Sequence, residues 1–373
     1  MLSEPYASQD KGDLHRRFDS VIGAALPSAE KLAGEILRDL DPTDYGVKWW
    51  RALPTQERIL IGDYLYQCVN GIQLNLTEAK LHYFEWLDAQ RRGNERIANG
   101  VSLDPRRGAT FKHPASHSAI DDLPSRLERL HLGGFFRAVG SSLDCLGGAI
   151  IGVLGLRTSL RYGDLKNAEN ALQNIGVSDG AGTQLQLSFL RFLEDAKQTA
   201  GPENWIEWTN QYRNMFVHRG RAASSHEIIP REHLFYDSQG QVIPRATSKL
   251  HLARFPDRSD IEALIIGKDT WLNEDANDSL IGIFSSCLKL EKETCERLCS
   301  IWAERRNDPL LIEQPVEQWN ARIRSCKFPG CQPPSEPFRG DNLNLNASLA
   351  HRMRAAAVDD AHRSLWDQSK WAD

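Results

Sequence analysis

Residues 202–220, which read PENWIEWTNQYRNMFVHRG, are the part of the chain that most clearly indicates the fold. Their apolar side chains recur at helical spacing, at Trp205, Trp208, Tyr212, Met215 and Phe216. This periodicity predicts one amphipathic helix, called the motif helix below. Pro202 suits the first turn of a helix and Gly220 suits its end.

Similar periodicity outside this segment predicts a mainly α protein, a helical bundle that carries the motif helix. The expected helices cover residues 13–25, 28–40, 54–70, 77–92, 124–156, 163–174, 182–199, 278–306 and 345–366. Asn70-Gly71 is expected to end one helix, and Gly93 another. Four glycines in the 124–156 helix are expected to let neighbouring helices approach closely; they are Gly140, Gly147, Gly148 and Gly152.

A small β excursion is expected after the motif helix, at about residues 228–266. Residues 232–236 and 241–244 flank a turn sequence and predict a β-hairpin, and residues 250–255 are a candidate third strand. We therefore expect an N-terminal helical region at 1–105, a bundle with the β excursion at 119–307, and an irregular segment with a C-terminal helix at 308–373. Residues 94–122 are the best candidate linker.

The amino-acid composition argues against some classes of function. The chain has 373 residues and a net charge of −5, which argues against a protein that coats long nucleic acid but not against a local basic cleft. The longest apolar stretch, residues 143–156, is too short to cross a bilayer, and the N-terminus does not resemble a signal peptide. Seven scattered cysteines fit a reducing compartment. We expect a cytoplasmic protein with no membrane partner.

The polar half of the motif helix carries the residues that suggest chemistry. Asn210, Arg213, Asn214 and His218 all lie opposite the apolar stripe. Arg213 and His218 are about 140° apart around the helix axis, so they cannot easily pair with each other but can line a groove. If two copies of this face meet across a two-fold axis, two arginines and two histidines converge.

The sequence Arg213-Asn214-Met-Phe-Val-His218 resembles the signature of the HEPN superfamily, in which an arginine precedes a histidine by a short interval and is often followed by Asn, Asp or His. Three Arg-x4-His pairs occur in the chain, beginning at Arg126, Arg213 and Arg221. Only the second has a polar Asn after its arginine, and it alone lies at the end of a strongly periodic helix. The resemblance is specific over about ten residues and extends plausibly over residues 124–220.

The resemblance implies a metal-independent endoribonuclease that acts as a homodimer on RNA. In that role His218 would move protons between the 2′-hydroxyl and the leaving oxygen, and Arg213 would hold the scissile phosphate. Asn214 would orient Arg213 or the phosphate, while Arg219 and Arg221 would follow the RNA backbone. A toxin or anti-phage role, with a regulatory or antitoxin protein as partner, is implied by analogy alone.

Two other interpretations remain open at this stage. The chain can be a HEPN-like module that binds RNA or protein, or dimerises, without catalysis. It can also be an unrelated helical protein, because His218 and Arg219 near a helix C-terminus favour the helix dipole and need no further reason. Gly220 stands where some HEPN toxins carry a tyrosine, so control through modification of such a tyrosine is not expected.

Other candidate sites are weaker. Cys326 and Cys331 are a possible metal pair, but no second pair lies nearby, and Cys295 and Cys299 are expected to pack in a core. We expect no resident metal or cofactor. Asp144 is more informative, because a carboxylate on an apolar helix needs a partner, which an arginine or histidine of the motif helix can supply.

Overall fold

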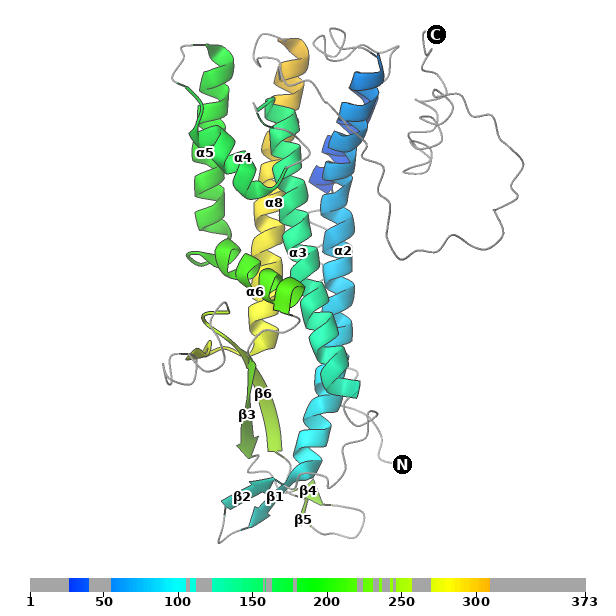
Figure 1. The fold of residues 1–373 in the computed structure, drawn as a ribbon, viewed down its shortest axis with the longest axis vertical. Coiled ribbons are helices and arrows are strands. Elements are labelled where there is room, and N and C mark those ends of the chain that lie inside the picture. The colour runs from blue at the N-terminus through cyan, green and yellow to red at the C-terminus, as the bar shows by residue number, and fades with distance from the viewer. Residues whose placement is uncertain are drawn as a thin grey trace, which may run out of the picture. The chain divides into compact units, whose positions relative to one another are not determined.

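The computed structural model describes residues 27–39, 55–104, 108–111, 123–156, 158, 163–176, 180–219, 224–230, 235–236, 242–243, 246–256 and 270–308. These residues are mainly helical, as the sequence predicts (Figure 1). The expected helices at 13–25 and 345–366 lie outside the described residues, as do Arg221, Cys326 and Cys331.

Most of the expected helices are confirmed to within two residues at each end. They are the helix over residues 27–39, α3 (Leu123–Leu154), α4 (Leu165–Gln173), α5 (Ala181–Ala200) and α8 (Ala276–Asn307). The motif helix is α6, Trp205–Arg219. The described residues fall into two compact units, and α2, α3, α5 and α8 each contribute to both. Of the described residues, unit 1 comprises those within Met1–Ala29, Asn70–Leu146 and Phe189–Glu296, and unit 2 comprises the others.

Helix α2, Thr55–Gly100, corrects the prediction of two helices separated at Asn70-Gly71. Gly71 lies inside α2, where a Cβ atom would be 2.7 Å from Sγ of Cys145 on α3. The Asn75 side chain donates a hydrogen bond of 2.7 Å to the Gly71 carbonyl. Gly71 therefore permits close helix packing rather than ending the helix, because the tertiary contact outweighs its low helical propensity.

The β elements are short antiparallel pairs. Strands β4 (Phe235–Tyr236) and β5 (Val242–Ile243) form the predicted hairpin, and β3 (Ser224–Pro230) pairs along its length with β6 (Ala246–Leu252). The excursion thus begins at Ser224, earlier than predicted. Strands β1 (Val101–Asp104) and β2 (Gly108–Phe111) pair within the segment expected to be a linker, which corrects that prediction.

Helix α3 is central to the core. The apolar stretch 143–156 belongs largely to this 32-residue helix, which by length and composition alone could cross a membrane. However, 72% of its most apolar window is buried inside the protein, where it packs as a core helix. The apolar helix is longer than the stretch 143–156 alone, because helical residues from Leu123 onward precede it.

The glycines of α3 within unit 2 permit the close approach expected of them. A Cβ atom on Gly147 would meet the backbone of Asp164, the N-cap residue of α4. Gly148 lies against Cys68, and Gly152 lies against Leu65. Each contact occupies space that a side chain on α3 would fill, so helix packing rather than helical propensity accounts for these glycines.

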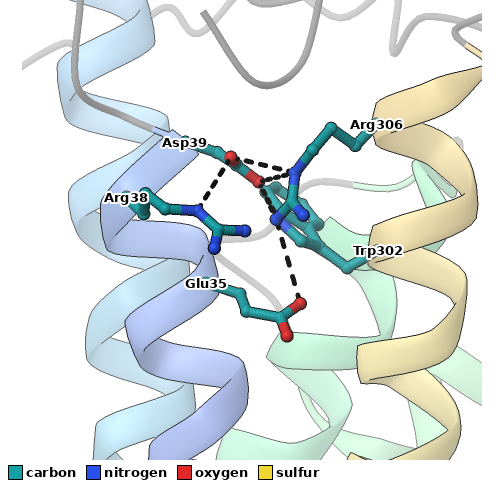
Figure 2. A network of polar contacts seen from close by, with 5 residues as sticks. All are labelled: Glu35, Arg38, Asp39, Trp302 and Arg306. Atoms are coloured by element: carbon teal, nitrogen blue, oxygen red, sulfur yellow. Dashed lines mark hydrogen bonds and ion pairs between the residues drawn. The ribbon is translucent and has the colours of Figure 1, made fainter. Parts of the chain in front are cut away.

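A polar network joins the helix over residues 27–39 to α8 within unit 2 (Figure 2). The Asp39 carboxylate accepts hydrogen bonds from Nε1 of Trp302, at 2.6 Å, and from Nε and Nη2 of Arg306, at 2.8 and 2.5 Å. Glu35 lies 3.8 Å from the same guanidinium. The Asp39 side chain is only 2% exposed, so these donors replace the water that it loses.

The neighbouring Arg305 is also buried in unit 2. Its Nη1 atom donates to the carbonyls of Gly152 and Val153, at 3.0 and 2.7 Å. These carbonyls belong to the last turn of α3, where backbone acceptors have no partner within the helix. Burial lowers the pKa of Arg305 from its usual high value to about 9. The guanidinium therefore provides hydrogen bonds to the carbonyls at the end of α3, although its burial costs free energy of desolvation.

Candidate functional site

The motif helix α6 follows a tight turn after α5. Asn204 adopts a left-handed conformation with φ of 61°, which asparagine tolerates better than most residues. Its carbonyl accepts the amide of Trp208 at 3.0 Å. The helix therefore begins at Trp205, so the expected helix start at Pro202 was wrong by three residues.

The buried face of α6 differs slightly from the predicted apolar stripe. Trp205, Thr209 and Tyr212 are buried, whereas Trp208, Met215 and Phe216 are half-buried. The Thr209 hydroxyl is satisfied by the Trp205 carbonyl at 2.7 Å, which explains how a polar residue fits on this face. The centre of the buried face therefore lies closer to Thr209 than predicted. As a result, the Arg213 side chain lies closer to the packed surface than expected.

Aromatic packing fixes α6 against α3 within unit 1. The Phe136 ring stacks on Tyr212, with centroids 4.6 Å apart, and also lies beside Trp208 and Phe216 at 5.9 and 6.1 Å. A Cβ on Gly133 would be 3.0 Å from Phe216. The motif helix therefore packs against a part of α3 where glycine, which has no side chain, allows the aromatic rings to approach closely.

Trp208 and Tyr212 also form hydrogen bonds with Ala253, the residue that follows β6. The Trp208 indole donates to the Ala253 carbonyl at 3.2 Å, and the Tyr212 hydroxyl lies 2.5 Å from the Ala253 amide and 3.3 Å from its carbonyl. Burial raises the pKa of Tyr212 far above its usual value. Tyr212 is therefore a neutral structural residue and not a general base.

Arg213 forms an ion pair with Asp144 of α3, between Nη1 and Oδ2 at 2.7 Å. This confirms the expectation that Asp144 has a partner on the motif helix. The side chains are 29% and 34% exposed, so the pair faces solvent at its edge. A Cβ on Gly140 would be 2.5 Å from Arg213 Cδ, so the missing side chain at Gly140 gives the arginine room beside α3.

Two other site residues, Asn214 and His218, lie on the open side of α6. Asn214 and His218 are exposed, and Arg219 is the last residue of the helix. Within the described residues, no hydrogen bond or ion pair joins Arg213 to His218. One copy of the chain therefore presents these groups separately, with the arginine held against α3 and the histidine directed outward.

This arrangement can support proton transfer and anion binding only if a further surface brings the groups together. An exposed imidazole can exchange protons near neutral pH, and a guanidinium has five N–H donors, so a single carboxylate oxygen does not occupy them all. Among the described residues, no group of three or more His, Cys, Asp and Glu side chains could hold a metal ion. The polar groups that α6 presents here are the half-buried guanidinium of Arg213 and the exposed amide of Asn214 and imidazole of His218.

A buried acid on α8, Glu291, was missed by the sequence analysis. Its Oε1 atom lies 2.6 Å from the Ser142 hydroxyl and 3.3 Å from Sγ of Cys287. Burial raises the pKa of Glu291 to about 8, so the carboxyl is mostly protonated at neutral pH. A protonated carboxyl can donate to Ser142, which in turn donates to the Ile72 carbonyl at 3.0 Å. The available signal was its place in the apolar stripe of α8, between Cys287 and Cys295.

Comparison of the chain with protein-family models, with curated proteins and with solved structures finds no match. The functional assignment therefore depends on the residues of the chain itself.

Replacing Gly140 with alanine is expected to lower the free energy of unfolding by about 1 kcal/mol, because the new methyl group displaces Arg213 from Asp144. Gly282 of α8 is the matched control, since nothing lies within 4 Å of its Cβ position. There, alanine is expected to raise stability by about 0.5–1 kcal/mol through helical propensity. Urea unfolding measures both values, and equal stabilisation of the two variants would contradict the packing of Arg213 over Gly140.

Proposed function

We propose that the chain is a metal-independent endoribonuclease of the HEPN type, with its active site on the polar face of α6. The observation that carries the proposal is the Arg213-Asn214…His218 pattern on a helix whose opposite face is packed. Because α6 is held by Phe136 and Ala253, its polar side chains project from a rigid support, as catalytic groups require.

The proposed reaction begins with attack of a ribose 2′-hydroxyl on the adjacent phosphate. His218 takes the hydroxyl proton or donates one to the leaving 5′-oxygen, and Arg213 balances the charge that develops on the phosphate. Asn214 orients the phosphate by hydrogen bonding. The products are a 2′,3′-cyclic phosphate and a 5′-hydroxyl end, and the reaction consumes no metal or external oxidant.

The active site is proposed to be composite and to form in a homodimer. In one chain, Arg213 lies against α3 while His218 is exposed, so the two groups need a second copy to converge on one phosphate. Val217, which lies between Arg213 and His218 in the sequence, is 52% exposed and offers apolar surface for such a contact. Arg219 and Arg221 are proposed to follow the RNA backbone, and the cellular role is proposed to be that of a toxin or anti-phage effector in the cytoplasm.

One observation favours a second candidate function, a HEPN-like binding or dimerisation module without catalysis. Asp144 neutralises much of the Arg213 charge, and its carboxylate repels a phosphate that approaches the same guanidinium. Such a module binds RNA or a protein partner and leaves RNA intact. The two functions are distinguished by whether the purified protein cleaves RNA.

His218→Ala is expected to lower the rate of RNA cleavage by about a hundred-fold or more, since general acid–base catalysis contributes at least that much. The measurement follows the initial rate on labelled single-stranded RNA and on tRNA. Glu207→Gln is the matched control, because Glu207 is exposed in the first turn of the same helix. Cleavage by the wild type and the control alone supports the proposal. Equal rates for wild type and His218→Ala would place the activity elsewhere, and binding without cleavage would favour the second function.

A further inference from the structure

Two histidines face each other between α2 and α3, away from the proposed nuclease site. Nδ1 of His82 lies 3.1 Å from Nδ1 of His131, and the ring centroids are 5.3 Å apart. Neither residue has a role in the function proposed above. From the position of these two nitrogens we infer that His82 and His131 form a two-histidine site for a divalent transition-metal ion such as Zn²⁺, Co²⁺ or Ni²⁺.

The distance between the two nitrogens fits two ligands of one ion. Imidazole nitrogen binds such ions at about 2.0–2.1 Å, so two nitrogens on a tetrahedral ion are about 3.3 Å apart, and at a right angle about 2.9 Å apart. The observed separation of 3.1 Å lies between these values. Imidazole suits zinc, nickel and copper ions, whereas Ca²⁺ and Mg²⁺ prefer oxygen ligands.

A neighbouring carboxylate favours the ring form that a metal ligand needs. Oε1 of Glu78, one helical turn before His82, lies 3.6 Å from Nε2 of His82. At this distance the carboxylate attracts a proton on Nε2 through charge rather than through a hydrogen bond, and that ring form leaves the lone pair of Nδ1 facing His131. Metal-binding histidines commonly have a carboxylate beside their second nitrogen, and Glu78 holds that position here.

The His82 ring, which belongs to α2, packs against Gly134 of α3. A Cβ on Gly134 would overlap the ring atoms Nδ1, Cε1 and Nε2, so only glycine leaves this room. The His82 side chain is 24% exposed, which lets an ion enter and lets water complete its coordination. Burial, His131 and Arg137 disfavour positive charge at His82 and lower its pKa, whereas the Glu78 carboxylate attracts a cation.

The site is incomplete as a set of protein ligands, which limits its affinity. No third His, Cys, Asp or Glu completes it among the described residues, so water or an external ligand takes the remaining positions. Structural zinc sites usually have four protein ligands. We therefore expect reversible binding, with a dissociation constant on the order of micromolar rather than nanomolar. Bound metal would tie α2 to α3 next to Gly133, the residue on which Phe216 of the motif helix rests.

The test is titration of the full-length, tag-free protein with Co²⁺, followed by visible absorption and calorimetry at neutral pH. The wild type is expected to bind one equivalent that lacks the charge-transfer bands of thiolate ligands. His82→Ala and His131→Gln are each expected to weaken that equivalent at least ten-fold. His251→Ala is the matched control, since His251 is a half-buried histidine held by Glu227 and backbone carbonyls.

Far-UV circular dichroism checks that each variant keeps its helices, and the two separate substitutions guard against one that fails to fold. Loss of the equivalent in both histidine variants and its retention in His251→Ala establish the site. Unchanged binding in either histidine variant, or no binding by the wild type, would overturn it. If the wild type does not bind the ion, the 3.1 Å contact is a direct hydrogen bond between the two rings.

Discussion

Replacing Asp39 with alanine is expected to lower the free energy of unfolding by about 3–5 kcal/mol, the usual cost of breaking a buried ion pair. The Asp39 carboxylate is the shared acceptor for Trp302 and Arg306 of α8. Its removal leaves the Trp302 indole N–H, which is fully buried, without this acceptor. Among the described residues it leaves the Arg306 guanidinium with only the more distant Glu35 as an acidic partner. Urea unfolding of the full chain, followed by circular dichroism, measures the loss.

Arg38→Ala is the matched control for this prediction. Arg38 lies 3.8 Å from the same carboxylate, but its side chain is 51% exposed. An exposed ion pair of this kind contributes less than about 1 kcal/mol. If Asp39→Ala costs no more than Arg38→Ala, the network in Figure 2 does not hold the helix over residues 27–39 to α8.

Glu291→Gln is expected to remove a dependence of stability on pH that amounts to a few kcal/mol in the wild type. The folded-state pKa of Glu291 is about 8, raised from 4.5 by burial, so between these values the folded state holds a proton that the unfolded state releases. The contribution of this group to the free energy of unfolding is complete below pH 4.5. It decreases as the pH rises and is lost once the pH passes through 8. The difference between the two pKa values corresponds to roughly 5 kcal/mol. Glutamine stays neutral throughout and keeps a hydrogen-bonding side chain.

The measurement is urea unfolding of the wild type and of Glu291→Gln at pH 5 and pH 8. The variant is expected to be the more stable of the two at pH 8, and to lose less stability between the two pH values. Glu304→Gln, an exposed position on the same helix, is the control and is expected to leave the pH dependence unchanged. An identical pH dependence in wild type and Glu291→Gln would mean that Glu291 is already ionised in the folded state.

Local periodicity was enough to predict most of the helices. The spacing of apolar residues in α3, α5 and α8 is set by which face is buried, and burial is what the sequence pattern records. The Asp144 partner was predicted for the same reason, because a carboxylate on an apolar helix must be compensated. The paired strands at β4 and β5 followed from turn residues between two apolar runs.

What the sequence could not predict depends on contacts between distant residues. Gly71 has the same local signature whether it ends a helix or lies against another, and only Cys145 on α3 decides between them. The pairing of β1 with β2 was missed because short strands leave little periodicity. Arg213 was expected on the polar half of the motif helix, but its close packing over Gly140 of α3 depends on a contact that the local sequence does not record. The meeting of His82 with His131 depends on the register of two helices.

The central proposal is that RNA is cut by its own 2′-hydroxyl at a site formed by Arg213 and His218. The most direct test compares two labelled RNAs in excess EDTA, one with ribose throughout and one with a 2′-deoxy sugar at the cleaved position. Cleavage of only the all-ribose strand, leaving cyclic-phosphate and 5′-hydroxyl ends, is the predicted result. Cleavage of the deoxy strand at the same position, or loss of all activity in EDTA, would contradict the proposed mechanism.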